Sequence, residues 1–318
     1  MPIVTQALIE DLLTEACAEV RRSFSRKWYR MDMPGSCDGE AACWASRTSC
    51  VVAGDHEGKF TLMSAIKPFL LLHLLETRGA DEVESWVDDL PSSRPYWSLD
   101  ELREDGGRPR NAMLNSGAML LASQLDGDHP LEQQASFLAW LSALCPEASL
   151  TVDEACLAEV LAPGADPHNL ALARELEAGS RVADALAAFE IYFRLCCLSG
   201  SIRDMAHMGN ALSHSPAPHR DRVLRTMVKC GLYEASADWF AKTGLAAKSG
   251  VSGVIFGIWP GEGCLAACGE WQDPGGNAMV PLRLLERAAR AALPAPLQAK
   301  TQSPGHSRDR GLGGISDA

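Results

Sequence analysis

Residues 64–67 are Ser64-Ala65-Ile66-Lys67, and the fold we expect for the chain follows from this stretch. The apolar run after it predicts a buried helix, so the serine and the lysine share one helical face at positions i and i+3. A lysine that has lost its proton can activate a neighbouring serine as a nucleophile, and free N–H groups at a helix start favour a developing oxyanion. On its own, the S-x-x-K pattern also fits an ordinary helix.

A second motif, Lys248-Ser249-Gly250, lies shortly before a strand-like stretch near the end of the chain. A K-[ST]-G motif accompanies S-x-x-K in the serine acyl-transfer enzymes that share the penicillin-binding and β-lactamase fold. The two motifs occur here in the same order. Together they favour serine acyl-transfer chemistry on a β-lactamase-like fold, although each is weak by itself.

Strand-like stretches occur near both ends of the chain. Apolar, β-prone runs bounded by glycine predict strands at 42–45 and 49–53, and again at 251–259 and 264–268, with a turn at 260–263. We therefore expect an α+β fold in which one antiparallel sheet is assembled from both chain ends.

The rest of the chain shows apolar residues at helical spacing. Thr5 is predicted to cap a first helix, and a last helix is predicted at 280–293. A helical lobe is expected over about 106–232, with helices at 116–125, 133–145, 170–178, 182–198 and 220–230. Residues 1–293 are predicted to form a single catalytic domain with its active site between sheet and lobe, and residues 294–318 a disordered tail.

Ordered segments along the chain carry a resemblance to a known family. They are Gly54-Asp55, Phe60–Lys67, Gly107–Ala118, Tyr192–Cys196, Cys230–Ser236, Thr243–Val251 and Gly275–Asn277. In this order they resemble the serine-dependent glutaminases, and the resemblance runs from about residue 5 to residue 293. It implies a β-lactamase-like amidohydrolase that converts L-glutamine to L-glutamate and ammonia, with no metal and no organic cofactor.

The resemblance also implies roles for individual residues. Ser64 would be the nucleophile, Lys67 its activating neighbour and Tyr233 a partner in proton transfer. The backbone N–H groups of Val251 and Ser64 would form the oxyanion hole. Attack on the amide would release ammonia, and water would then hydrolyse the γ-glutamyl ester.

Four further residues are candidates for holding the substrate. The resemblance implies that Asn115, Asn169 and Tyr192 bind its amino-acid end, and Tyr29 is a candidate although its neighbours match the family poorly. The residues alone also allow structural roles, since Asn115 and Asn169 could cap helices and Tyr192 could belong to the core. The ordered match favours substrate binding.

Two of the departures from the family fall at positions where a polar residue is expected. The family has glutamine where this chain has Met63, and a carboxylate for the substrate ammonium where this chain has Ala162, seven residues before Asn169. Glu159 and Asp166 are the nearby carboxylates that could replace it. A lost charge-assisted contact costs about 1.5–3 kcal/mol. A same-fold serine amidase or esterase of altered specificity, or a catalytically weakened ligand-binding homologue, is therefore the alternative, and a non-enzymatic interaction protein a third.

Composition excludes several other classes of protein. The 318 residues include 29 Lys and Arg against 41 Asp and Glu, a net charge of −12, which disfavours nucleic acid and anionic membranes as partners. Acidic residues interrupt the N-terminal apolar stretch, and no apolar run approaches the roughly 20 residues that span a bilayer. We expect a cytoplasmic protein whose partner is the small molecule L-glutamine, and by resemblance a homo-oligomer, a dimer or tetramer.

The chain has eleven cysteines and no C-x-x-C pair. In the absence of a secretory signal we expect reduced and mostly buried thiols that act as small hydrophobic side chains. A structural zinc site is the alternative, but the usual ligand spacings are missing.

Overall fold

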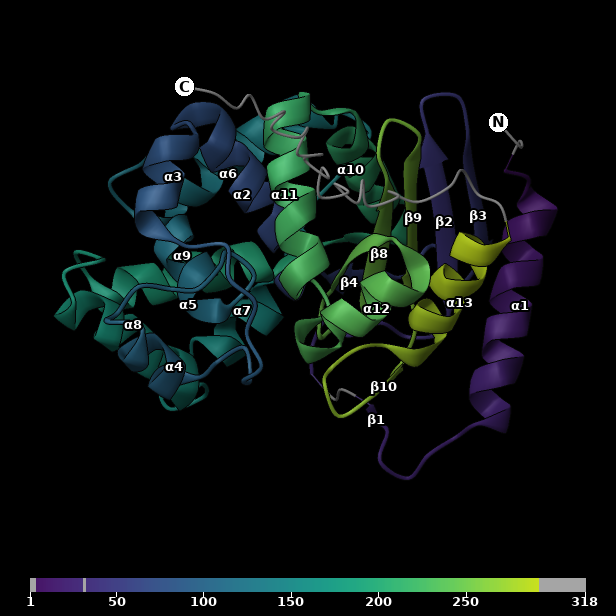
Figure 1. The fold of residues 1–318 in the computed structure, drawn as a ribbon, viewed down its shortest axis with the longest axis horizontal. Coiled ribbons are helices and arrows are strands. Elements are labelled where there is room, and N and C mark those ends of the chain that lie inside the picture. The colour runs from purple at the N-terminus through teal and green to yellow at the C-terminus, as the bar shows by residue number, and fades with distance from the viewer. Residues whose placement is uncertain (1–3, 31–32, 292–318) are drawn as a thin grey trace, which may run out of the picture.

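The computed structural model describes residues 4–30 and 33–291 (Figure 1). A sheet with flanking helices forms one side of the molecule, and a group of helices forms the other (Figure 1). The tail predicted at 294–318 lies outside the described residues, as do the last residues of the helix predicted at 280–293. No helix in the described ranges is long and apolar enough to cross a membrane.

The main sheet has five antiparallel strands from both ends of the chain, as predicted. Their order is β3-β2-β9-β8-β7, and their bounds are β2 (Ala41–Ser46), β3 (Cys50–Gly54), β7 (Ala246–Ser249), β8 (Val254–Trp259) and β9 (Gly263–Cys268). Trp44 pairs with Leu265, so the N-terminal hairpin joins the C-terminal one along β2 and β9. The prediction of a strand from Val251 is wrong, because Gly253 has a φ of 108° and closes a turn onto Gly250.

Helices cover both faces of this sheet. The helices that cover it are α1 (Gln6–Arg22) and α13 (Met279–Arg290) on one face and α10 (Ile202–His214) on the other. Under α1 and α13, Trp44 and Trp259 pack edge to face with ring centroids 5.5 Å apart. On the other face, Gly209 lies against the Cys264 sulfur, where a Cβ would clash. Glycine therefore lets α10 approach the strands closely.

The helical side of the molecule contains most of the predicted helices, with boundaries shifted by a few residues. Its members are α2 (Lys67–Thr77), α3 (Ala80–Trp86), α4 (Leu99–Glu104), α5 (Asn115–Ala122), α6 (Pro130–Leu144), α7 (Glu154–Val160), α8 (Pro167–Ala178) and α9 (Ala185–Cys196). The chain returns to the sheet through α11 (Ala217–Cys230), the 3₁₀ turn η2 (Tyr233–Ala235) and α12 (Ser236–Thr243). One cluster of buried apolar side chains joins the α10 face of the sheet to these helices.

Short strands were missed in the region predicted to be helical. These are β5 (Thr151–Val152) and β6 (Leu198–Ser201), which join β4 (Lys59–Thr61) in a small sheet of order β4-β6-β5. A strand of two to four residues is too short to show a period of two, and Leu198 continues the apolar pattern of α9. A separate pair joins β1 (Tyr29–Arg30) to β10 (Trp271–Gln272).

The two sequence motifs meet where sheet and helices join. Strand β4 leads into the 3₁₀ turn η1 (Met63–Ile66), which runs directly into α2 with Pro68 in its first turn, as expected. A Cβ on Gly250 would lie 2.6 Å from the Leu62 carbonyl oxygen and 3.5 Å from the Ala65 nitrogen. The glycine of the K-S-G motif thus allows the end of β7 to approach the backbone that carries Ser64.

Candidate active site

Three side chains of the two motifs are buried together at this junction. Ser64, Lys67 and Lys248 are 5%, 1% and 0% exposed. The Lys67 Nζ donates hydrogen bonds to the Met113 carbonyl at 3.0 Å and to Asn115 Oδ1 at 2.6 Å. The Lys248 Nζ donates to the Ser249 carbonyl at 2.6 Å. Within the described part of the chain, neither ammonium has a carboxylate as salt-bridge partner, so desolvation is not compensated by an opposite charge.

Burial changes the protonation of both lysines. Desolvation lowers the pKa of Lys67 to about 8, and desolvation together with the charge of Lys67 lowers the pKa of Lys248 well below its usual value. With a pKa of about 8, about one Lys67 in ten is uncharged at pH 7. An uncharged Lys67 one helical turn from Ser64 is able to accept the serine proton.

Tyr233 lies on the other side of the serine. Its hydroxyl faces those of Ser64 and Ser249, and the Lys248 Nζ lies 4.5 Å from the centre of its ring. Among the described residues, no partner is in hydrogen-bonding geometry to the buried hydroxyls of Tyr233 and Ser249. Burial raises the pKa of Tyr233 to about 12, so the phenol keeps its proton at neutral pH. It can therefore donate or relay a proton, but it cannot act as the initial base.

Backbone strain is found on both sides of Ser64. Met63 has a φ of 46° and Tyr233 a φ of 56°, and in the described ranges only Ser180 is a further non-glycine residue with positive φ. Such conformations cost about 1–3 kcal/mol each and cluster at functional sites. The strain at Met63 directly precedes the predicted nucleophile.

A chain of hydrogen bonds leads from Lys67 into the helical side. Asn115 Nδ2 donates to Asn169 Oδ1 at 2.8 Å, and Asn169 Nδ2 donates to Asp166 Oδ2 at 2.6 Å. The N-cap of α8 is Asp166, whose Oδ1 accepts from the Asn169 N–H, and α5 begins at Asn115 without a side-chain cap. The helix-cap alternative is therefore wrong for both asparagines, whose side chains instead connect a carboxylate to Lys67.

Asp166 is the nearby carboxylate that is bonded to the predicted site. Ala162 lies exposed in the turn between α7 and α8, and Glu159 is exposed on α7. Asp166 is partly buried, holds Asn169 and raises the pKa of Tyr96 through its charge, after the larger effect of burial. Of the two carboxylates near Ala162 that the sequence offers, the structure brings Asp166 to the site.

The chain has four tyrosines, and the other three lie near Tyr233 or Lys67. Tyr96 stacks on Tyr233 with ring centroids 4.6 Å apart, and the Lys67 Nζ lies 5.5 Å from the ring centre of Tyr192. Tyr192 is buried on α9, which fits both substrate binding and the core role considered for it. Sequence reasoning missed Tyr96, which lies in a loop without a motif, and the scarcity of tyrosine was the available signal.

Tyr29 lies at a cavity beside Tyr233. The cavity has a volume of about 150 Å³ and is lined by Tyr29, Pro95, Tyr96, Trp97, Glu234, Pro274, Gly275 and Gly276. Tyr29 pairs with Gln272, whose Nε2 donates to the Val251 carbonyl at 2.5 Å. Within residues 4–30 and 33–291, the N–H of Val251 has no hydrogen-bond acceptor. The arrangement leaves this N–H available for an oxyanion.

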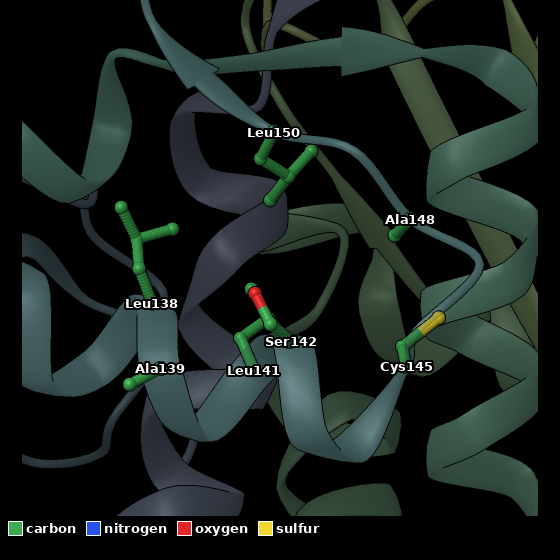
Figure 2. Close-up of a pocket in the computed structure, with 7 residues that line it drawn as sticks. All are labelled: Leu138, Ala139, Leu141, Ser142, Cys145, Ala148 and Leu150. Carbon is green, nitrogen blue, oxygen red and sulfur yellow. The ribbon is translucent and has the colours of Figure 1, made fainter.

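A second cavity, shown in Figure 2, lies between α6 and the segment that leads to β5. Its volume is about 210 Å³, and it is lined by Leu138, Ala139, Leu141, Ser142, Cys145, Ala148 and Leu150. These side chains are mostly apolar and include no predicted site residue. In the described ranges, moreover, no three His, Cys, Asp or Glu side chains are grouped so as to hold a metal ion. Our candidate active site is the Ser64 junction, because both sequence motifs meet there with their serine and lysines buried together.

Comparisons with known proteins agree with the family that the sequence resembles. The family model for glutaminases matches residues 41–293. A glutaminase of Synechocystis is 41% identical over 242 residues, which cover 74% of this chain and 73% of the relative. A glutaminase of Geobacillus kaustophilus is 31% identical over 253 residues, covering 76% of this chain and 81% of that one.

Solved structures show the same fold. A crystal structure of a probable glutaminase of Bacillus subtilis superimposes with a TM-score of 0.80 at 22% sequence identity, covering 90% of this chain and 96% of that one. The expected β-lactamase-like architecture is thereby confirmed. With a family model over most of its length and a relative at 41% identity, the chain belongs to the glutaminase family.

Proposed function

We propose that the protein hydrolyses L-glutamine to L-glutamate and ammonia through an acyl-enzyme on Ser64. Uncharged Lys67 removes the Ser64 proton as the hydroxyl attacks the side-chain amide. The N–H groups of Val251 and Ser64 stabilise the oxyanion, Tyr233 delivers a proton to the departing ammonia, and water hydrolyses the ester. The observation that carries this proposal is the buried Lys67, with a lowered pKa, one turn from Ser64.

The amino-acid end of the substrate is held from the helical side in this proposal. Asn115, Asn169 and Tyr192 bind it, and Tyr29 closes the site. The Asp166 carboxylate binds the substrate ammonium and replaces the carboxylate that the family has at the position of Ala162. Support comes from the hydrogen bonds that connect Asp166 to Asn169 and on to Asn115. No metal or organic cofactor enters these steps.

The family resemblance supports three further proposals, on location, assembly and domain organisation. The protein acts in the cytoplasm, it assembles as a homo-oligomer, a dimer or tetramer, and residues 1–293 form one catalytic domain. A second candidate function is hydrolysis of another amide or ester by the same serine. It is favoured by Ala162, because the position that carries the family's carboxylate is an exposed turn here.

The test is ammonia release from L-glutamine by the purified protein and its Ser64→Ala variant. We expect release by the wild type, loss of at least about a thousandfold in kcat for Ser64→Ala, and no change for Ser142→Ala, whose serine lines the cavity of Figure 2. Equal background release by wild type and Ser64→Ala would refute glutaminase activity. Labelling of Ser64 by an acylating glutamine analogue without turnover of glutamine would indicate the altered-substrate alternative.

A further inference from the structure

Two of the eleven cysteines are partly exposed, and they lie in opposite electrostatic surroundings. They are Cys17 on α1 and Cys50 at the start of β3, and the other nine are buried. Burial and the charge of Glu40 raise the pKa of Cys17. Cys50 instead faces two basic side chains of α10, Arg203 and His207, whose i, i+4 spacing puts them on one helical face.

Two side chains, one basic and one a second cysteine, lie close to the sulfur of Cys50. Arg203 Nη1 lies 3.3 Å from it, and the sulfur of Cys43 lies 3.7 Å from it. Cys43 on β2 pairs with Val52, two residues beyond Cys50, so both sulfurs project from the same face of the sheet. Cys43 is fully buried, whereas Cys50 is accessible from solvent.

These contacts favour the thiolate at Cys50. Hydrogen bonds from Cys43 and His207, together with the charges of His207 and Arg203, lower the pKa of Cys50 against the effect of its burial. The hydrogen bond to Cys50 raises the pKa of Cys43 and also that of His207, to whose rise Glu147 contributes. The Arg203 guanidinium lies against the Cys50 sulfur, so Cys50 is the cysteine of the pair at which a thiolate is stabilised. A thiolate is the reactive form of cysteine, and accessible thiolates beside a second cysteine are typical of redox-sensitive sites.

We propose that Cys50 and Cys43 form a peroxide-responsive dithiol site that is separate from the catalytic site. The Cys50 thiolate attacks one oxygen of hydrogen peroxide, the O–O bond breaks, and the products are Cys50 sulfenic acid and hydroxide, which is protonated to water. The Cys43 thiol then attacks the Cys50 sulfur, an S–S bond forms, and the S–OH oxygen leaves with the thiol proton as a second water. The two sulfurs lose two electrons and the peroxide gains them. A dithiol reductant reverses the reaction.

Disulfide formation requires movement at the start of β3, because Cys43 and Cys50 are diagonal rather than directly opposed neighbours on adjacent strands. The sulfurs must approach from 3.7 Å to about 2.05 Å. Cys50 is the first residue of edge strand β3, directly after the turn at 47–49, so a neighbouring strand restrains its backbone on one side only. In the strand order, β3 and the K-S-G strand β7 are the two opposite edges. The proposed site therefore lies across the sheet from Lys248.

The test uses the wild-type protein, in which Cys17, the other partly exposed cysteine, is the internal control. Reduced full-length protein is treated with hydrogen peroxide at neutral pH, quenched with an alkylating reagent and digested with trypsin. Arg47 lies between the two cysteines, so cleavage there separates them and a linked peptide reports the bond. We expect the free thiol of Cys50 to disappear at least about tenfold faster than that of Cys17. The free thiol of Cys43 should disappear together with it, and the two cysteines should appear in a linked peptide that dithiothreitol separates.

Two variants test the order of events. In Cys43→Ser, Cys50 should still react and should be trapped as an adduct by a 1,3-dione probe for sulfenic acids, without a linked peptide. In Arg203→Met, the free thiol of Cys50 should disappear several-fold more slowly, while the rate for the Cys17 thiol stays unchanged. A Cys50 that reacts no faster than Cys17 in the wild type overturns the proposal, as does oxidation of Cys43 in Cys50→Ser at the wild-type rate.

Discussion

The reacting side of the candidate site and its recognition side are built on different principles. On the reacting side, Ser64, Lys67, Lys248 and Tyr233 are buried, and the lysines have no carboxylate partner in the described ranges. Their pKa values are set by desolvation. On the recognition side, a row of amides ends at the partly exposed Asp166 carboxylate. In the proposed mechanism, the uncompensated burial of the lysines serves proton transfer, and the hydrogen-bonded carboxylate serves binding of a charged group.

Asn115 belongs to both sides. Its Oδ1 accepts from Lys67 and its Nδ2 donates to Asn169, so one amide fixes the distance between base and binding network. Substitutions on the reacting side should therefore change kcat, and substitutions on the recognition side should change KM. Effects at Asn115 should appear in both.

After Ser64→Ala, the largest effect is expected from Lys67→Met, which removes the proposed base and keeps the buried volume nearly unchanged. We expect kcat to fall by about a hundred- to ten-thousandfold with KM nearly constant. Steady-state assays of ammonia release measure this. The control is Lys242→Met, since Lys242 pairs with Glu286 on the far side of the sheet and should leave activity unchanged. A loss that appears mainly in KM would contradict the separation of the two sides.

The pH dependence of the wild type is the next largest effect. The folded-state pKa of Lys67 is lowered to about 8, so the active uncharged amine is the minor form below that pH. We expect kcat/KM to rise about tenfold per pH unit below about 8 and to level off above it. A profile that is flat between pH 6 and pH 8 would rule out Lys67 as the titrating base.

On the recognition side, Asp166→Asn should weaken binding of the substrate ammonium. A charge-assisted contact is worth about 1.5–3 kcal/mol, so KM should rise about ten- to a hundredfold while kcat changes little. The matched control is Glu159→Gln, because Glu159 is the other carboxylate near Ala162 but is exposed. An equal rise in KM for the two variants, or a rise for Glu159→Gln alone, would show that Asp166 is not the group that binds the substrate ammonium.

The smallest effect is expected from Asn115→Ala. Loss of one hydrogen bond from an uncharged amide side chain should raise KM about two- to tenfold, and more than it lowers kcat. Because Asn115 Oδ1 accepts from the charged form of Lys67, its removal should also shift the pH profile to lower pH. An unchanged profile would show that Asn115 does not couple the two sides.

The sequence carries a clearer signal for the reacting side than for the recognition side, for physical reasons. Ser64 and Lys67 are related by helical spacing, which is visible in four residues, and the K-S-G motif is equally local. Tyr96 contacts Tyr233 from a segment far away in the chain, and such a contact leaves no local pattern. The sequence offered both Glu159 and Asp166, and only the fold shows that Asp166 is the partly buried one that is bonded to Asn169. Two errors in the fold have local causes. Val251 precedes the apolar strand β8 so closely that the turn at 251–253 was predicted as part of it, and Leu198 of β6 continues the apolar pattern of α9.

The most direct test of the central claim is the fate of Ser64 during turnover. Glutamine is mixed with the protein, the reaction is quenched in acid within one turnover, and the peptide carrying Ser64 is analysed by mass spectrometry. Our account predicts a γ-glutamyl ester on Ser64 that disappears as glutamate is released and never forms in Ser64→Ala. Glutamate and ammonia produced at the wild-type rate by Ser64→Ala, without any acylated peptide, would contradict it.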